Sequence, residues 1–482
     1  MNKHIFMNSS VLLGAAFLAT QAIAQTKKNK PTPQRPNILF ILADDLGYGD
    51  LSCYGQEKFE TPNIDNLALQ GMRFTQCYSG TTVSAPSRSC LVTGLHSGHT
   101  PIRGNKGVKP EGQFPLPEGT YTIFNLFKQN GYTTGAFGKW GLGAIGSTGE
   151  PNKMGVDHFF GYNCQTLAHN YYPDHLWNND KRVELKENLN GGYGQYSADL
   201  IHNKAMEFID ENKNKPFFLF YPTTIPHAEL IVPEDSIIKK FRGKYPETPY
   251  LGNDSYERKG GYCSQVHPHA TFAAMIYRLD VRVGQIIQKL KDLGLYDNTI
   301  IIFTSDNGPH MEGGGDPEFF NGNGIYRGFK RDVYEGGIRV PMIVSWPGHI
   351  KAGTETNFMC SFWDMLPTFN EILNGKPVEK TDGISLLPLL ENKKGQKLHD
   401  YLYFEFHEMN GRQAVHKGDW KLVHLNVSIP AQEKYELYNL AADPQEKHNI
   451  ILQYPEIEKE LKAIMVKAHV KDSNWPLFEF EK

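Results

Sequence analysis

Two apolar runs that lie far apart in the sequence end in the same kind of polar residues. Asn37 to Ala43 leads into Asp44-Asp45, and Asn298 to Thr304 leads, after one serine, into Asp306-Asn307. A continuous apolar run of this length is typical of a strand that is buried on both faces, as in a parallel sheet. The sequence therefore predicts an α/β fold in which two buried strands carry polar residues at their carboxyl ends.

The four polar residues at these strand ends offer only oxygen ligands. Adjacent carboxylates such as Asp44 and Asp45 are unfavourable unless a cation lies between them. Carboxylate and amide oxygens suit a hard cation, and no His or Cys joins Asp44, Asp45, Asp306 and Asn307. The set therefore favours calcium over zinc. The alternative for the first pair is a solvated turn in which Asp44 or Asp45 caps a helix.

Further runs predict the other elements of the core. Apolar runs predict strands over Phe74–Tyr78, Tyr132–Phe137, Pro216–Tyr221 and Met342–Trp346. Helical periodicity predicts helices that begin near Thr61 and over Tyr121–Asn130 and Met275–Leu293. From about Phe404 onward, short strands (Trp420–His424, Glu436–Tyr438) and a helix over Glu456–Lys467 predict a smaller antiparallel C-terminal domain.

The segment Ser84-Ala85-Pro86-Ser87-Arg88 reads as the start of a helix that continues to Thr93. A helix N-terminus presents unpaired N–H groups and therefore favours an anion. Arg88 adds a permanently charged planar group that suits a tetrahedral oxyanion. The alternative is an ordinary helix start in which Ser84 or Ser87 is the N-cap.

Three further side chains follow predicted strands or glycine-rich turns. Lys139 ends a strand among glycines, where a close approach to a bound anion is possible, and Lys330 follows Gly328-Phe329. His227 comes just after a strand end, a position at which α/β enzymes hold acids and bases. A solvated lysine and a structural histidine are the alternatives. Glu335 and Arg339 predict a structural ion pair.

A loop-rich segment over residues 161–180 interleaves aromatic and polar side chains. It contains His169, Tyr171, Tyr172, His175 and Trp177. Such a segment suits a surface that binds sugar, and it suits a packed, tyrosine-rich loop equally well.

The N-terminus predicts an exported protein. Lys3, the apolar run Val11 to Thr20 and the small residues Ala22-Ile23-Ala24 match a signal peptide over residues 1–24, with cleavage after Ala24. Residues 25–35 predict a flexible leader, 36–408 a catalytic domain and 409–482 a C-terminal subdomain. No later apolar run is long enough to span a membrane.

The composition argues against a nucleic-acid-binding protein and against a fold held by zinc or by many disulfides. The net charge of −3 gives no basic surface for nucleic acid. The six cysteines follow neither a zinc pattern nor a dense disulfide pattern.

Taken together, the motifs resemble the type I sulfatase family of the alkaline phosphatase superfamily. The resemblance extends from about Pro36 to Asn449. It is carried by Asp44-Asp45, Ser84 through Gly94, Gly138-Lys139-Trp140, Asp306-Asn307-Gly308, Gly328 through Pro341, Asp382-Gly383 and Asp443-Pro444. It implies a large mixed, mostly parallel central sheet sandwiched by helices, followed by the small C-terminal α+β domain.

The resemblance implies a role for each candidate residue. Ser84 would be converted to formylglycine, whose hydrated aldehyde attacks sulfur; an unmodified serine without an adjacent base is a poor nucleophile. One calcium ion would be held by Asp44, Asp45, Asp306, Asn307 and the modified side chain at 84. Arg88, Lys139 and Lys330 would bind sulfate, and His227 would protonate the leaving alcohol.

Two departures from the family pattern stand out. Many members have Cys where this chain has Ser84, which implies an anaerobic maturating enzyme as a partner and a bacterial source. The signal peptide then predicts a periplasmic or secreted product. Many also have His where this chain has Gly141. His169 and His310 are the candidates that could replace it.

The segments 138–143 and 161–177 look most like bacterial N-acetylgalactosamine or galactose sulfatases. The expected substrate is therefore an O-sulfated galactose-type residue of a glycosaminoglycan or mucin, attacked from the chain end, with 6-O attachment ahead of 4-O. His169, His175 and His310 are candidates for substrate binding. The alternatives are a phosphate or phosphonate monoester hydrolase of the same superfamily and a non-catalytic binder of sulfated glycans.

Overall fold

The computed structural model describes residues 35–109, 111–255, 261–373 and 375–482. The predicted signal peptide and most of the predicted leader lie outside these residues. Residues 35–482 form one compact unit. In the described part of the chain, no helix is both long and apolar enough to cross a membrane.

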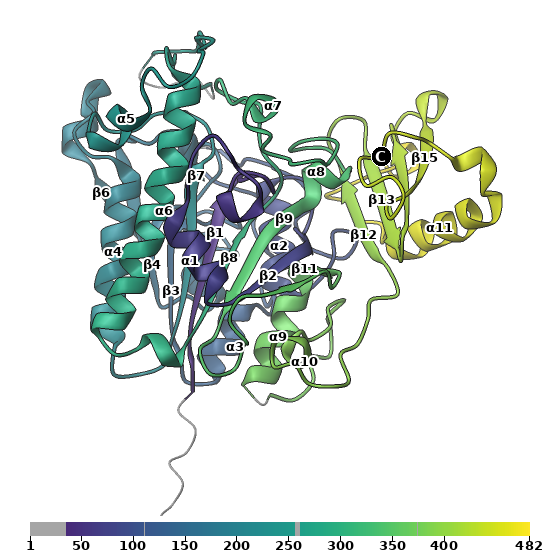
Figure 1. The fold of residues 1–482 in the computed structure, drawn as a ribbon, viewed down its shortest axis with the longest axis horizontal. Helices are drawn as coiled ribbons and strands as arrows, with labels where there is room; N and C mark the ends of the chain where they lie inside the picture. Colours follow the sequence, from purple (N-terminus) through teal and green to yellow (C-terminus); the bar gives the residue numbers. More distant parts are fainter. Residues whose placement is uncertain (1–34, 110, 256–260, 374) are drawn as a thin grey trace, which may run out of the picture. The chain divides into compact units, whose positions relative to one another are not determined.

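A mixed, mostly parallel sheet forms the centre of the fold (Figure 1). Its strand order is β10-β2-β9-β8-β1-β7-β3-β4-β5-β6, with β11 paired to β2. The strands are β1 (Asn37–Asp44), β2 (Met72–Tyr78), β3 (Thr133–Lys139), β4 (His158–Tyr162), β5 (His175–Asn178), β6 (Lys181–Glu184), β7 (Phe217–Pro226), β8 (Thr299–Ser305), β9 (Arg339–Ser345), β10 (Thr354–Thr356) and β11 (Cys360–Ser361).

The predicted parallel neighbours are confirmed at the centre of this sheet. Strand β1 pairs in parallel with both β7 and β8. The register places Ala43 opposite Ser305 and Asp44 opposite Pro226. The residues that follow β1, β7 and β8 therefore emerge at the same edge of the sheet.

Helices cover both faces of the central sheet. Along β1, Leu39 and Ile41 belong to one apolar cluster, while Ile38 and Phe40 belong to the other. The first cluster includes side chains of α1 (Pro62–Leu69), α4 (Ser197–Asn212), α5 (Ser236–Phe241) and α6 (Pro268–Asp292). The second includes side chains of α2 (Ser84–Thr93), α3 (Ile123–Gln129), α9 (Met365–Ile372) and α10 (Leu387–Leu390). The predicted sandwich is thus confirmed.

The C-terminal part forms a second, antiparallel sheet, as predicted. Its order is β12 (Leu402–Phe406), β13 (Arg412–Lys417), β14 (Trp420–Leu425) and β15 (Lys434–Asn439), and α11 (Pro455–Ala468) packs on it (Figure 1). Two short helices, α7 (Pro317–Phe320) and α8 (Glu335–Ile338), lie between β8 and β9. The first strand of this sheet begins seven residues before the predicted subdomain boundary.

Some element ends differ from the prediction. Helix α6 begins at Pro268 rather than near Met275: Pro268 suits the first turn of a helix, and the added turns bury Ala270, Phe272, Ala273 and Ala274 in the first apolar cluster. Strand β7 continues to Pro226. The N-cap of α2 is Val83, so neither Ser84 nor Ser87 caps the helix; their hydroxyl groups bond to Asp44 and to the Asp306 carbonyl instead.

Candidate active site and metal centre

The carboxyl ends of β1 and β8 bring four oxygen-bearing side chains together. Asp44, Asp45, Asp306 and Asn307 are all buried. The Asp45 backbone N–H donates to Asp306 Oδ1 at 3.1 Å, and Asn307 Nδ2 donates to Asp45 Oδ1 at 2.7 Å. The two strand ends therefore form one polar cluster, as their parallel pairing requires.

Three cationic side chains compensate the buried carboxylates. Lys139, the last residue of β3, places Nζ 2.7 Å from Asp44 Oδ2. Lys330 places Nζ 2.8 Å from Asp45 Oδ2. Arg88 donates through Nε and Nη2 to Asp306 Oδ2 at 3.1 and 2.8 Å. Each carboxylate thus has its own cationic partner, which offsets the cost of burying charge.

The carboxylates respond to these partners in different ways. Burial alone would raise the pKa of Asp44, but Lys139, His227 and Arg88 outweigh it and hold that pKa well below its usual value. Burial and the nearby Asp44 raise the pKa of Asp306 to about 7. Asp44 therefore carries a negative charge at neutral pH, while Asp306 titrates close to neutrality.

Ser84 lies at the centre of this cluster as the first residue of α2. Its Oγ donates to Asp44 Oδ1 at 2.9 Å and lies 3.3 Å from Lys139 Nζ. The neighbouring turn is fixed by Ser87, whose Oγ donates to the Asp306 carbonyl at 2.6 Å. The start of α2 is thereby tied to the ends of β1, β3 and β8.

Two of the predicted histidines flank His227. The rings of His169 and His227 stack at 5.0 Å, and those of His227 and His310 at 5.7 Å. His227 Nε2 lies 3.1 Å from Lys330 Nζ and 3.4 Å from Asp45 Oδ2. Burial and the charge of Lys330 lower the pKa of His227 to about 4. In this state, His227 donates from Nδ1 to the Ala228 carbonyl and presents a lone pair at Nε2.

His175 lies apart from these residues. Its ring nitrogens contact Glu111 Oε2 at 2.7 Å and Asp174 Oδ1 at 2.5 Å, and its ring packs against Trp177. Within the described residues, its side-chain contacts include none of the other candidate site residues. His175 is thus a hydrogen-bonded residue of β5 that lies outside the cluster around Ser84.

Glu312 is a site residue that the sequence analysis missed. Its Oε2 lies 2.8 Å from Lys330 Nζ, and its Oε1 lies 2.5 Å from Arg331. Burial would raise the pKa of Glu312, but Lys330, His227, His310 and Arg331 outweigh it and lower that pKa. Glu312 lies two residues after His310 in the irregular segment that follows β8, where no periodic pattern identifies it.

Gln165 was missed as well, and it occupies the space beside Gly141. Gly141 has a φ of +72°, and a Cβ at this position would lie 2.2 Å from Gln165 Nε2. That Nε2 is buried and has no hydrogen-bond partner among the described residues. The amide of Gln165 therefore lies where a larger residue at 141 would project.

The oxygen cluster fits a hard cation. Besides the three carboxylates, Asn307 Oδ1 is buried without a hydrogen-bond partner among the described residues. Single ligand atoms of Asp44, Asp45 and His227 lie within 4.8 Å of one another. Hard divalent cations bind carboxylate and amide oxygens of this kind. The residues present thus suit a metal centre at the ends of β1 and β8.

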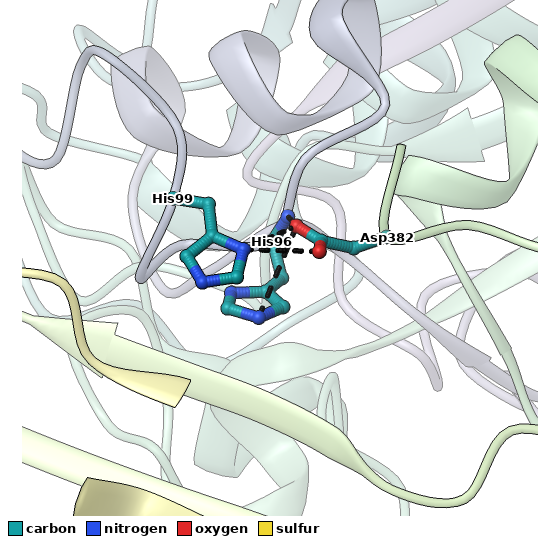
Figure 2. Close-up of side chains that lie close together, drawn as sticks. All are labelled: His96, His99 and Asp382. Atoms are coloured by element: carbon teal, nitrogen blue, oxygen red, sulfur yellow. Dashed lines mark hydrogen bonds and ion pairs between the residues drawn. The ribbon is translucent and has the colours of Figure 1, made fainter. Parts of the chain in front are cut away.

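A second group of metal-ligand type, His96, His99 and Asp382, fits a metal less well. Figure 2 shows the His99 ring and the Asp382 carboxylate pointing toward one another. His99 Nδ1 lies 2.9 Å from both carboxylate oxygens. His96 Nδ1, however, accepts the Gly98 backbone N–H at 3.1 Å. A neutral imidazole has one lone-pair nitrogen, so His96 keeps its proton on Nε2. We therefore assign this group to the hydrogen bonds that hold the chain after α2.

Comparisons with known proteins agree with this architecture. The profile of the Sulfatase family matches residues 36–375, and that of the N-sulphoglucosamine sulphohydrolase C-terminal family matches residues 324–471. An N-acetylgalactosamine-6-O-sulfatase of Bacteroides thetaiotaomicron is 31% identical over 96% of this chain and 99% of its own length. Human arylsulfatase A is 31% identical over 86% of this chain and 83% of its own length.

Solved structures share the fold. The crystal structure of Ps i-CgsB in complex with k-i-k-neocarrahexaose superposes with a TM-score of 0.76 and 28% identity. The match covers 92% of this chain and 95% of the other. A phosphonate monoester hydrolase of Agrobacterium radiobacter superposes with a TM-score of 0.62 at 21% identity, which is a likeness of fold alone. The expected alkaline-phosphatase-like architecture is thus confirmed.

Proposed function

This chain belongs to the sulfatase family, and we propose that it hydrolyses sulfate esters of sugars at a centre built around Ser84. The observation that carries the proposal is the position of Ser84 Oγ, 2.9 Å from Asp44 Oδ1 and 3.3 Å from Lys139 Nζ. A reactive group on this side chain would face both the oxygen cluster and the cations that suit a sulfate.

The proposed substrate is a sulfated sugar of the galactose type. The similar bacterial protein is named for action on N-acetylgalactosamine 6-O-sulfate. We extend this to O-sulfated N-acetylgalactosamine or galactose at the end of a glycosaminoglycan or mucin chain, with 6-O attachment ahead of 4-O. The export implied by residues 1–24 would bring the enzyme to such extracellular glycans.

Ser84 itself is proposed to be modified to formylglycine by a maturating enzyme. Its hydroxyl donates to Asp44, but Lys139 and Arg88 hold the pKa of Asp44 low, so Asp44 is a weak base. An unmodified serine with so weak a base is a poor nucleophile. The modification supplies an aldehyde hydrate, which is a stronger nucleophile toward sulfur.

The proposed metal is one calcium ion, held by Asp44, Asp45, Asp306, Asn307 and the side chain at 84. When bound, it supplies positive charge that neutralises sulfate oxygens. Arg88, Lys139 and Lys330 would hold the sulfate from their present positions around the cluster and stabilise the charge that develops.

His227 is proposed as the group that protonates the leaving sugar. Its Nε2 faces Lys330 and Asp45, so it must gain a proton at Nε2 before it can donate one. The negative charge of a bound sulfate ester would raise the pKa of His227, because an opposite charge favours the protonated imidazole. His169 and His310 flank the ring and would hold its orientation. The buried amide of Gln165 would donate a hydrogen bond near the place of the histidine that Gly141 replaces.

Mass spectrometry of residue 84 in protein from the native host, combined with sulfate release, tests the proposal. We expect a loss of about two mass units at Ser84, as oxidation of an alcohol to an aldehyde requires, and release of sulfate from a galactose-type sugar. Ser84→Ala should bind the sugar without turnover. Appreciable turnover by this variant would exclude the mechanism, and hydrolysis of aryl phosphate in place of sulfate would favour the phosphoesterase alternative.

A further inference from the structure

A cleft of about 430 Å³ opens next to α5, and its walls include none of the candidate catalytic residues. Its walls include Tyr172, Tyr193, Ile231, Val232, Arg242 and Gln265. This volume falls within the range of small-molecule sites. None of these residues belongs to the proposed catalytic machinery, so the cleft requires its own explanation.

Three chain segments run from the candidate active site into the walls of this cleft. Tyr172 follows His169 by three residues, Ile231 follows His227 by four, and Gln265 follows Tyr262 by three. The rings of His169, His227 and Tyr262 pack on one another, with centroids 5.0 to 6.3 Å apart. Four extended residues reach at most about 14 Å. The cleft therefore lies within the reach of a short oligosaccharide from the catalytic group.

Aromatic and aliphatic side chains form the apolar part of the cleft. The rings of Tyr172 and Tyr193 pack edge to face, with centroids 5.0 Å apart. Tyr172 is buried and rests on Tyr196, whereas 54% of Tyr193 is exposed. A rigid tyrosine that presents its ring to solvent offers contact area to a ligand at a small cost in conformational entropy.

The charged groups of the cleft compensate one another. Arg242 forms a two-fold ion pair with Glu234. Gln265 Nε2 donates to the Leu230 carbonyl at 2.7 Å, and Thr271 Oγ1 donates to the His267 carbonyl at 2.8 Å. The cleft thus combines aromatic surface with polar groups, and the charges of Arg242 and Glu234 cancel. These properties favour an uncharged polyhydroxy ligand over an anion.

We propose that this cleft binds a further sugar ring of the same glycan chain, beyond the ring that carries the sulfate. This inference rests on the proposed function and deepens it. The ring packs on Tyr193 and its hydroxyl groups face Arg242, Glu234 and Gln265. The enzyme accordingly prefers a sulfated oligosaccharide over the sulfated monosaccharide.

Kinetics on substrates of two lengths tests the assignment. We compare N-acetylgalactosamine 6-sulfate with a tetrasaccharide that ends in the same residue. Tyr193→Ala should lower kcat/KM for the tetrasaccharide about tenfold, the upper range for one lost aromatic contact, and leave that for the monosaccharide unchanged. Tyr121→Ala, which removes another exposed tyrosine, is the matched control. An equal loss on both substrates, or no loss on the tetrasaccharide, would overturn the assignment.

A binding measurement separates this inference from the proposed function. In a Ser84→Ala background, calorimetry gives the affinity for the tetrasaccharide without any turnover. We expect Tyr193→Ala to weaken that affinity about tenfold as well. If the wild-type protein releases no sulfate but the affinity still depends on Tyr193, the proposed function fails and the cleft assignment stands. If the affinity does not change, the cleft assignment fails whatever the activity.

Discussion

The Nζ atom of Lys330 lies 2.8 Å from Oδ2 of Asp45, although 285 residues separate the two in the chain. The neighbouring Asp44 has a different partner, Lys139, whose Nζ lies 2.7 Å from its Oδ2. Two adjacent carboxylates are thus held at one strand end by two separate lysines. The remaining oxygen atoms of the cluster are the ones that a metal would use; among them is Asn307 Oδ1, which has no hydrogen-bond partner in the part of the chain that the structure describes.

Calcium should therefore bind to this cluster and stabilise the fold. A ligand that binds only the folded state at 100 times its Kd adds about 2.7 kcal/mol to the free energy of unfolding. We expect EGTA to lower the melting temperature, calcium to restore it, and Asp45→Asn to abolish the response. Metal content measured by mass spectrometry gives the stoichiometry. Asp210→Asn, on the surface of α4, is the control; a calcium response that persists in Asp45→Asn would exclude this site.

Gly141→Ala should lower activity without unfolding the protein. The new Cβ would lie 2.2 Å from Gln165 Nε2, at a backbone φ of +72° that disfavours side chains. The amide of Gln165 must move, and we expect kcat to fall about tenfold, as for the loss of one well-placed hydrogen bond of about 1.4 kcal/mol. Gly146→Ala, also at positive φ but with open space around it, controls for backbone strain. Equal kcat in Gly141→Ala and wild type would remove Gln165 from the site.

The sequence predicted the oxygen cluster because strand register determines it. Asp44 and Asp306 each follow a buried apolar run, and parallel neighbours place such residues at one edge. Lys139 and His227 were predicted because each lies at or just after a strand end, whereas Lys330 was singled out as a cation that follows Gly328-Phe329. Gln165 and Glu312 were not predicted, because a turn and an irregular segment, rather than a periodic pattern, set their positions. The sequence also did not predict Val83 as the N-cap of α2, because serine is the better capping residue. The hydroxyl group of Ser84 donates to Asp44 instead of capping the helix.

The C-terminal sheet should hold the loop of Lys330 in place. Lys421 of β14 is buried, with Nζ 2.9 Å from both Glu335 Oε1 and Glu446 Oε1. Glu335 also forms the predicted ion pair with Arg339, at 3.1 Å. Lys421→Met removes the cation that the buried Glu335 and Glu446 share and should cost about 3–5 kcal/mol in the free energy of unfolding. Lys417→Met, whose exposed pair with Glu460 is worth at most about 1 kcal/mol, is the control.

Urea unfolding of both lysine variants measures this difference. If Lys421→Met proves as stable as Lys417→Met, the buried charges do not hold the loop. Under conditions in which both variants stay folded, a rise in KM in Lys421→Met but not in Lys417→Met would show that the loop also positions Lys330.

His227→Ala should affect poor leaving groups more than good ones. A sugar alkoxide needs a proton as it leaves, whereas an activated phenolate does not. We expect kcat/KM to fall about 100-fold or more for the sulfated sugar and much less for 4-nitrophenyl sulfate. Rates for both substrates on one enzyme preparation give the ratio. Equal losses would remove His227 as the proton donor.

The pH dependence of stability should report the contact between His469 and Glu405. His469 Nδ1 lies 2.8 Å from the buried Glu405 Oε2, which joins the end of α11 to β12. Burial opposes charge at His469, but hydrogen bonds to Glu405 and Glu481 outweigh it and raise the pKa above 6.5. This stabilisation is fully present below about pH 6.5 and is lost as the pH rises through the raised pKa. Burial would raise the pKa of Glu405, but His407, His469 and Arg103 outweigh burial and lower that pKa below 4.5. The stabilisation that the Glu405 carboxylate contributes is therefore present above about pH 4.5 and is lost in acid.

The melting temperature of the wild type should therefore exceed that of His469→Gln most between about pH 4.5 and 6.5, and the difference should shrink toward pH 9. The exposed His448→Gln serves as the control, and a difference that does not vary with pH would show that His469 acts through packing rather than charge.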